Sequence, residues 1–234
     1  MESPKGTDKC GINVAREYRS LLKKGILMAS GIPRLDIALD GGFQSGEVVE
    51  ICGRSLSGKS QFCMRIAVQA AINGYMCTEQ ESAFDVFRRI RVIGATSIFG
   101  VLDELEKMQQ AFAGRSDYVS KIGCQNYDRL YCAEKILNKF AGTIKYMAKR
   151  RNLVIVVVNN IRVIHQNGVK VDRIMLGRLW SFVPQIRVIF SRVDAPSLGP
   201  KAGQPLKLRV KVARSVRSRT NEEFDVELTS GGLR

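Results

Sequence analysis

Residues 53–60 read Gly53-Arg54-Ser55-Leu56-Ser57-Gly58-Lys59-Ser60, and this stretch decides the fold. It fits the pattern G-x-x-x-x-G-K-[ST], in which a loop wraps around phosphate groups. The two glycines let the backbone curl closely around phosphate oxygens, and the N–H groups that open the next helix point at the anion. We therefore predict that this loop binds the triphosphate of a nucleotide.

Two side chains of the loop have separate tasks in such a site. Lys59 is expected to reach the β- and γ-phosphates, and Ser60 is expected to ligate Mg²⁺. The flanking sequence argues against a chance match, because residues 47–52 form a short apolar run that is typical of a buried strand. Downstream, apolar residues recur at helical spacing: Phe62, Ile66, Ala70 and Ala71. The order strand, loop, helix is the one that the loop requires.

The overall composition is that of one globular domain. The chain has 234 residues, of which 45% are hydrophobic, and this suits a single α/β domain. No apolar run approaches membrane length, and the N-terminus lacks the apolar segment of a signal peptide, so we expect a soluble, intracellular protein. Six cysteines show no C-x-x-C pair, which favours reduced structural thiols over a zinc site.

The charge of the chain is strongly unbalanced. Its formal net charge is +15, which is more than solubility requires and indicates a polyanionic partner. The basic residues are not gathered on one amphipathic helix with a bulky apolar face. Nucleic acid is therefore a better candidate than a membrane surface.

Several motifs resemble one known family. Residues 30–36 (SGIPRLD) and 40–47 (DGGFQSGE), followed by the phosphate loop and Gln61, resemble the start of the ATPase core of RecA-type recombinases. Residues 87–93 (FRRIRVI) and 176–184 (LGRLWSFVP) resemble the D-type member of the eukaryotic recombinase paralogues. The resemblance implies ATP and Mg²⁺ as cofactors and adds Gln61 to the residues of the nucleotide site.

The same resemblance implies the fold and the domains. We expect an α/β fold: a RecA-like P-loop ATPase core with a twisted, mostly parallel sheet flanked by helices and a C-terminal antiparallel extension. This core should span residues 25–234. Residues 1–24 are polar at their start and are expected to form a short, partly disordered N-terminal segment.

Glu79 is the candidate general base. It follows the strand-like residues 75–78, and a carboxylate at the end of a strand lies on the ligand side of an open α/β sheet. In the family, a glutamate at this place activates the attacking water, so we predict that Glu79 and Lys59 are catalytic. The alternative is a solvated glutamate at the end of a strand.

Asn159 is the candidate sensor of the γ-phosphate. Residues 153–158 form a β-branched run, typical of a central strand that is buried on both faces. This run ends in Asn159-Asn160, at the position where the family has a polar pair with a sensing amide. The alternative is a magnesium motif with asparagine in place of aspartate.

Two family features are absent from the sequence. Residues 114–132 contain no apolar strand that ends in a magnesium-coordinating aspartate; residues 118–123 are the only strand-like stretch there. Without that acid the metal loses an anchor and the attacking water loses orientation, so hydrolysis should be weak or dispensable. The chain also lacks the Phe-x-x-Ala sequence that joins subunits of the main recombinase, which disfavours long filaments of this chain.

Two stretches are candidate DNA-binding segments. Residues 161–175 are predicted to be a loop, and their position resembles the second DNA-binding loop of recombinases. Residues 206–212 alternate strictly between apolar and cationic, which predicts a half-buried strand. The alternative for this strand is an ordinary solvated outer face. The candidate DNA contacts are Arg162, His165, Lys170, Arg173, Lys207, Arg209, Lys211, Arg214, Arg217 and Arg219.

Together these observations predict an ATP-binding recombinase paralogue that assists or remodels a recombinase filament on single-stranded DNA during homologous recombination and DNA repair. Its expected partners are the filament, the DNA and another recombinase paralogue in a hetero-oligomer, and its expected location is the nucleus, with no membrane involved. One alternative is an autonomous DNA-dependent ATPase with Lys59, Ser60 and Glu79 in catalysis. A further alternative is a scaffold whose phosphate loop is vestigial.

Overall fold

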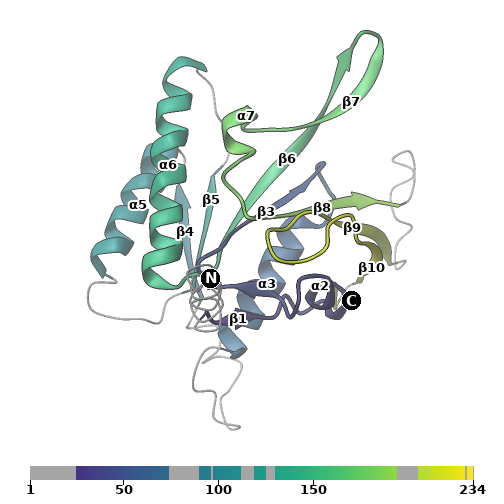
Figure 1. The fold of residues 1–234 in the computed structure, drawn as a ribbon, viewed down its shortest axis with the longest axis horizontal. Helices are drawn as coiled ribbons and strands as arrows, with labels where there is room; N and C mark the ends of the chain where they lie inside the picture. The colour runs from purple at the N-terminus through teal and green to yellow at the C-terminus, as the bar shows by residue number, and fades with distance from the viewer. Residues whose placement is uncertain are drawn as a thin grey trace, which may run out of the picture.

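Helices cover both faces of a central sheet in the computed structural model, which describes residues 25–73, 90–95, 97–111, 119–124, 130–193, 205–229 and 231–233 (Figure 1). The helices are α2 (Pro33–Ala38), α3 (Lys59–Asn73), α5 (Ile98–Ala111), α6 (Leu130–Arg151) and α7 (Gly177–Trp180). In the part of the chain described, no helix combines the length and the apolar character needed to cross a bilayer.

The central sheet is mixed. Its strand order is β11–β10–β9–β8–β3–β6–β7, and only the three central strands β8, β3 and β6 are parallel to one another. The seven strands are β3 (Val48–Gly53), β6 (Ile155–Gln166), β7 (Val169–Ile174), β8 (Ile186–Arg192), β9 (Leu206–Arg214), β10 (Glu223–Thr229) and β11 (Gly232–Leu233). The predicted α/β fold with a C-terminal antiparallel extension is confirmed.

Two small sheets complete the architecture. β1 (Leu27–Met28) and β2 (Phe43–Gln44) form an antiparallel pair, whereas β4 (Ile90–Ala95) and β5 (Val119–Cys124) form a parallel pair. β5 lies within the stretch where the sequence offered only one strand-like segment, and no aspartate closes it.

The strand β3 separates two hydrophobic cores. All six of its residues are buried. Val49 and Ile51 belong to the core beneath α2 and α3, whereas Val48 belongs to the core beneath α5 and α6. Parallel strands that are covered on both faces are continuously apolar, and this is why β3 was recognisable in the sequence. The loop therefore follows a strand that is buried along its whole length.

A β-hairpin replaces the loop predicted at residues 161–175. β6 continues past the predicted strand end to Gln166 and pairs with β7 in antiparallel register. Its turn residues, Asn167 and Gly168, have φ values of 51° and 78°. Positive φ at both central residues is the mark of the type I′ turn that joins tightly twisted strands. The hairpin projects beyond the rest of the sheet (Figure 1).

Candidate nucleotide site and cationic surfaces

The predicted phosphate loop lies between β3 and α3, at the carboxyl end of the parallel strands. Only glycine fits at its two glycine positions. A Cβ on Gly53 would collide with the Ser57 hydroxyl and with the backbone oxygen of Phe190. Gly58 has a φ of +84°, and a Cβ there would meet the side chain of Leu208. The loop is therefore packed closely against β8, through Phe190, and against β9, through Leu208.

Lys59 is held inside this loop. Its ammonium donates to the backbone oxygens of Gly53 at 2.9 Å and Arg54 at 2.7 Å, and the residue is only 7% exposed. Burial lowers the pKa of this amine, because a charged group is penalised away from water. No acid forms an ion pair with Lys59 within the described residues. An anionic ligand at the loop would supply the missing counter-charge.

The loop also contains a buried hydroxyl without a hydrogen-bond partner among the described residues. It is the hydroxyl of Ser57. Ser60 and Gln61 open α3 with exposed side chains, next to the free N–H groups of its first turn. A glycine cradle, a buried ammonium and an unpartnered hydroxyl fit a polyphosphate ligand.

The remaining loop residues face outward. Ser55 is exposed, and Leu56 is 80% exposed with a φ of 61°. The Arg54 guanidinium forms an ion pair with Asp172 of β7 at 2.6 Å, with both side chains at least half exposed. The loop thus contacts the β6–β7 hairpin through one polar pair.

Asn159 lies beside the loop, but its amide group already donates two hydrogen bonds within the fold. In the parallel pairing of β3 with β6, Cys52 is opposite Asn159 and Gly53 is opposite Asn160. The Asn159 amide donates to Glu50 at 2.7 Å and to the backbone oxygen of Met175 at 2.9 Å. Both amide hydrogens are therefore engaged inside the fold, which argues against the predicted contact with the γ-phosphate. Asn160 is the exposed member of the pair.

Sequence reasoning missed the group that holds Asn159. Glu50, in the middle of β3, is fully buried. It accepts hydrogen bonds from the Trp180 indole at 2.6 Å, from Asn159, and from the Arg187 guanidinium at 2.5 Å. A buried carboxylate needs such donors. A glutamate within an otherwise apolar strand is therefore the sequence signal that could have indicated this network. The network fixes β6, α7 and β8 against the strand that carries the loop.

Glu79, the predicted general base, lies outside the described residues, as do residues 75–78 before it. The structure therefore brings residues 53–61 together in one loop. The role of Glu79 as the general base stays a prediction. Within the described residues, no three His, Cys, Asp or Glu side chains cluster in a way that would hold a metal ion.

The hairpin carries four of the predicted DNA contacts. Arg162 is opposite Arg173, and His165 is opposite Lys170. All four side chains are exposed. Because side chains alternate along a strand, the first pair lies on one face of the ribbon and the second pair on the other. The face of Arg162 and Arg173 is therefore cationic, and the other face carries Lys170 together with Asp172.

The cationic face predicted on β9 is balanced by acids, which corrects the expectation of an unbalanced patch. Across the strand pair, Lys211 is opposite Glu223, Arg209 is opposite Asp225, and Lys207 is opposite Glu227. The first two pairs are ion pairs, at 2.6 Å and 2.8 Å. The sequence around β9 contains no acid, so only the pairing with β10 reveals the neutralisation.

Two of the three following arginines are used within the fold, which corrects their expected role as free cations. Arg214 donates to the backbone oxygen of Ser181. Arg217 is half-buried, forms an ion pair with Glu47 at 2.9 Å and also donates to the backbone oxygens of Leu39 and Gly42. Arg214 thus ties the end of β9, and Arg217 the segment after it, to other parts of the domain.

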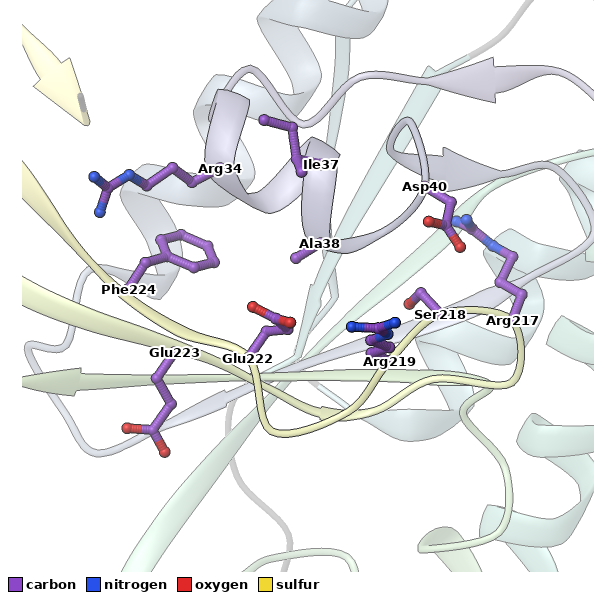
Figure 2. A pocket seen from close by; sticks show the side chains of 10 residues that line it. All are labelled: Arg34, Ile37, Ala38, Asp40, Arg217, Ser218, Arg219, Glu222, Glu223 and Phe224. Carbon is purple, nitrogen blue, oxygen red and sulfur yellow. The ribbon is translucent and has the colours of Figure 1, made fainter.

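Arg219 is exposed and lines a pocket of about 500 Å³ between α2 and the segment before β10 (Figure 2). Figure 2 shows Arg219 and Glu222 beneath Ala38, with Arg34 beside Phe224 at the other end. None of the phosphate-loop residues lines this pocket. It carries acids as well as bases, so its charge does not select one kind of ion.

Comparisons with known proteins agree with this geometry. Two proteins described as "DNA repair protein RAD51 homolog 4", from Mus musculus and Bos taurus, are each 27% identical to this chain; the alignments cover 80% of this chain and 68% of each relative. The "DNA repair and recombination protein RadB" of Methanococcoides burtonii is 25% identical over 57% of this chain and 70% of that protein. The expected resemblance to a D-type recombinase paralogue is confirmed.

A solved structure shows the same fold. The "Crystal structure of the RadB recombinase" superimposes with a TM-score of 0.62 at 14% identity, covering 88% of this chain and 98% of that chain. At this identity the likeness concerns the fold alone. The family model described as "ATPase: KaiC" matches residues 28–189, which include the phosphate loop, the parallel strands β3 and β6, and the first part of β8. This chain therefore belongs to the KaiC family of ATPases.

Proposed function

We propose that this protein is an ATP-binding recombinase paralogue that assists or remodels a recombinase filament on single-stranded DNA during homologous recombination and DNA repair. The observation that carries the proposal is the phosphate loop: Lys59 is buried without an acidic partner among the described residues, and a Cβ at Gly53 or Gly58 would collide with the packing of the loop. The names of the similar proteins, which concern DNA repair and recombination, support the process.

In this proposal the core, residues 25–234, is one nucleotide-binding domain. Residues 53–61 surround the phosphates, with Lys59 neutralising their charge and Ser60 holding Mg²⁺ through its hydroxyl. Mg²⁺ would screen the charge of the phosphate oxygens. Glu79 is proposed as the general base. Hydrolysis is proposed to be weak, because Ser60 is the one metal ligand that the sequence supplies with a clear motif.

The β6–β7 hairpin is the proposed DNA-binding element. Its cations are exposed on both faces, which suits a flexible single strand whose phosphates must be met from more than one side. Asp172 is the acid of β7, and it forms an ion pair with Arg54; the cations of the hairpin form no ion pair with an acid within the described residues. The cations of β9 are not part of this proposed surface, because β10 balances them.

The proposed partners are the recombinase filament and a second recombinase paralogue, in the nucleus. An accessory subunit that binds both a nucleotide and DNA would act on a filament that is assembled on DNA. The nucleotide would favour one arrangement of the loop and hairpin over another, through a difference in its affinity for the two.

Nucleotide binding is tested by thermal unfolding of the wild type and of Lys59→Ala, with and without Mg²⁺-ATP. A ligand that binds only the native state must stabilise it, by about 2.7 kcal/mol at one hundred times its Kd. We expect this stabilisation in the wild type and in the control Lys149→Ala, which removes an exposed lysine of α6. We expect none in Lys59→Ala. A wild type whose unfolding ignores ATP would refute nucleotide binding.

Binding to the filament is tested with fluorescent single-stranded DNA, alone and with a purified recombinase assembled on it. The variant Arg162→Ala/Lys170→Ala/Arg173→Ala should lose DNA affinity. The control Lys207→Ala/Arg209→Ala/Lys211→Ala removes as many cations from β9 and should keep most of it, since their charges are already balanced. Equal affinities of the two variants would contradict the hairpin surface, and failure to bind either DNA or recombinase would contradict the proposed function.

A further inference from the structure

Two buried polar side-chain atoms have no hydrogen-bond partner in the described part of the chain, and they lie at the same edge of the sheet. One is the Ser57 hydroxyl in the phosphate loop, and the other is Nε of Arg192. Burying a donor without an acceptor destabilises a fold, and more so when the donor carries charge. Native proteins retain such groups where a ligand completes them.

Arg192 is the last residue of β8, which runs parallel to the loop strand β3. Gly53, where the loop leaves β3, is opposite Phe190, so Arg192 lies two residues further along the same edge. Alternation along β8 puts Arg192 on the face of Phe190. That is the α3 face, because the Phe190 ring packs against Phe62 of α3 with ring centroids 4.9 Å apart.

The pairing of β8 with β9 also places Arg192 near the loop. Its register partner on the neighbouring strand β9 is Leu208, and paired residues in a ladder project to the same face. The Leu208 side chain is the group that a Cβ on Gly58 would meet. Arg192 therefore flanks the residue that packs against the loop one position before Lys59.

The arginine of the loop and the other arginine of β8 are already paired. Arg54 holds Asp172, and Arg187, on the opposite face of β8, holds Glu50. For Arg192 no ion pair with an acid is found within the described residues. Among the described residues, the Arg192 guanidinium is therefore, like the Lys59 ammonium, a cation without an acidic partner.

We propose that Arg192 is a second cationic ligand of the bound nucleotide and donates from β8 to the oxygens of its phosphate chain, while Lys59 contacts the chain from within the loop. A planar guanidinium suits phosphate, because its parallel N–H groups match two oxygens at once. This assignment rests on the proposed binding of a nucleotide to the loop.

The test is calorimetric titration of Mg²⁺-ATP into the wild type, Arg192→Met, Arg192→Lys and Arg151→Met. Arg192→Met should weaken binding about tenfold or more, since a hydrogen bond to a charged group is lost. Arg192→Lys keeps the charge but loses the parallel N–H groups of the guanidinium, so its affinity for Mg²⁺-ATP should lie between those of the wild type and Arg192→Met. Arg151→Met removes an exposed arginine of α6 and should bind like the wild type.

Unfolding without nucleotide separates a ligand contact from a structural role. The Met variant should be at least as stable as the wild type, because it removes a buried donor that has no acceptor. Wild-type affinity in Arg192→Met, or in Arg192→Lys if the Met variant does not fold, would overturn the assignment. So would a variant that is unstable without ATP but binds it normally once folded. A wild type that binds no ATP would instead refute the proposed function itself.

Discussion

Leu56 is the strained residue of the phosphate loop. Its φ of 61° lies in the left-handed region, where a Cβ crowds the following carbonyl oxygen at a cost of about 1–2 kcal/mol. Three other residues with positive φ are asparagines, which tolerate this region: Asn152, Asn167 and Asn221. Leu56 is also 80% exposed, so its side chain gains little from packing. The closure of the loop therefore imposes the conformation.

We predict that Leu56→Gly stabilises the free protein by about 0.5–1 kcal/mol, because relief of left-handed strain exceeds the added chain entropy of glycine. Leu56→Ala should not stabilise it, since alanine keeps the Cβ. Urea denaturation measures both, with the fluorescence of Trp180, the single tryptophan, as the signal. An equal effect of Gly and Ala would show that strain at this residue is not the cause.

At the scale of elements, the Glu50 network joins four of them. Glu50 of β3 is fully buried, and its Arg187 partner on β8 is 14% exposed. Asn159 of β6 and Trp180 of α7 complete the set of donors. A buried ion pair is costly to break from one side, because the remaining charge stays buried without compensation.

Arg187→Met should therefore lower the free energy of unfolding by about 3–5 kcal/mol. Arg209→Met is the matched control, since it also removes an arginine bonded to a carboxylate on a neighbouring strand, but in an exposed pair. Its effect should be much smaller. Chemical denaturation with Trp180 emission reports both, and comparable losses in the two variants would contradict the role of burial.

The two ion pairs between β9 and β10 predict a pH dependence. Hydrogen bonds from Arg209 and Lys211 hold the pKa values of Asp225 and Glu223 below their ordinary values. A carboxyl group with a lowered pKa in the folded state adds stability above its unfolded pKa, and this stability is lost as the pH falls through the folded pKa. The contribution is thus present at neutral pH and lost in acid.

We expect Glu223→Gln/Asp225→Asn to flatten the fall in stability between about pH 5 and about pH 2. Glu227→Gln, on the same strand opposite Lys207, is the control. Urea midpoints at several pH values and at low salt give the comparison. A variant curve parallel to that of the wild type would show that these pairs add nothing.

For the whole molecule, the net charge of +15 is spread unevenly between balanced and unbalanced surfaces. The β9–β10 face carries opposite charges in register, whereas the hairpin presents cations on both of its faces. Long-range attraction of a polyanion therefore depends on where charges are unpaired more than on their total.

This distribution predicts how salt acts on binding to single-stranded DNA. Each phosphate contact contributes about 0.7 to the slope of log K against log salt concentration, so loss of three contacts should reduce the slope by about 2. We expect that reduction for Arg162→Ala/Lys170→Ala/Arg173→Ala, measured by fluorescence anisotropy over a salt series. An unchanged slope with weaker binding would mean that the hairpin acts through its shape and not through phosphate contacts.

The sequence by itself determined the phosphate loop, the strand before it, the helix after it and the alternating strand β9. These are local features: glycine spacing, a continuous apolar run and a period of two are written in neighbouring residues. The sequence also contains a hairpin signal, because Asn167-Gly168 between alternating valines is typical of a type I′ turn, although the segment resembles a DNA-binding loop of the family by position.

Only the tertiary structure decided which charges are free. Glu50 and Arg187 are 137 residues apart, and Glu47 and Arg217 are 170 apart, so no local pattern predicts that they meet. The same holds for the acids that balance β9, and for Arg192, whose Nε is buried without a partner among the described residues. A charge acquires its partner through strand register and burial, and these are properties of the assembled sheet.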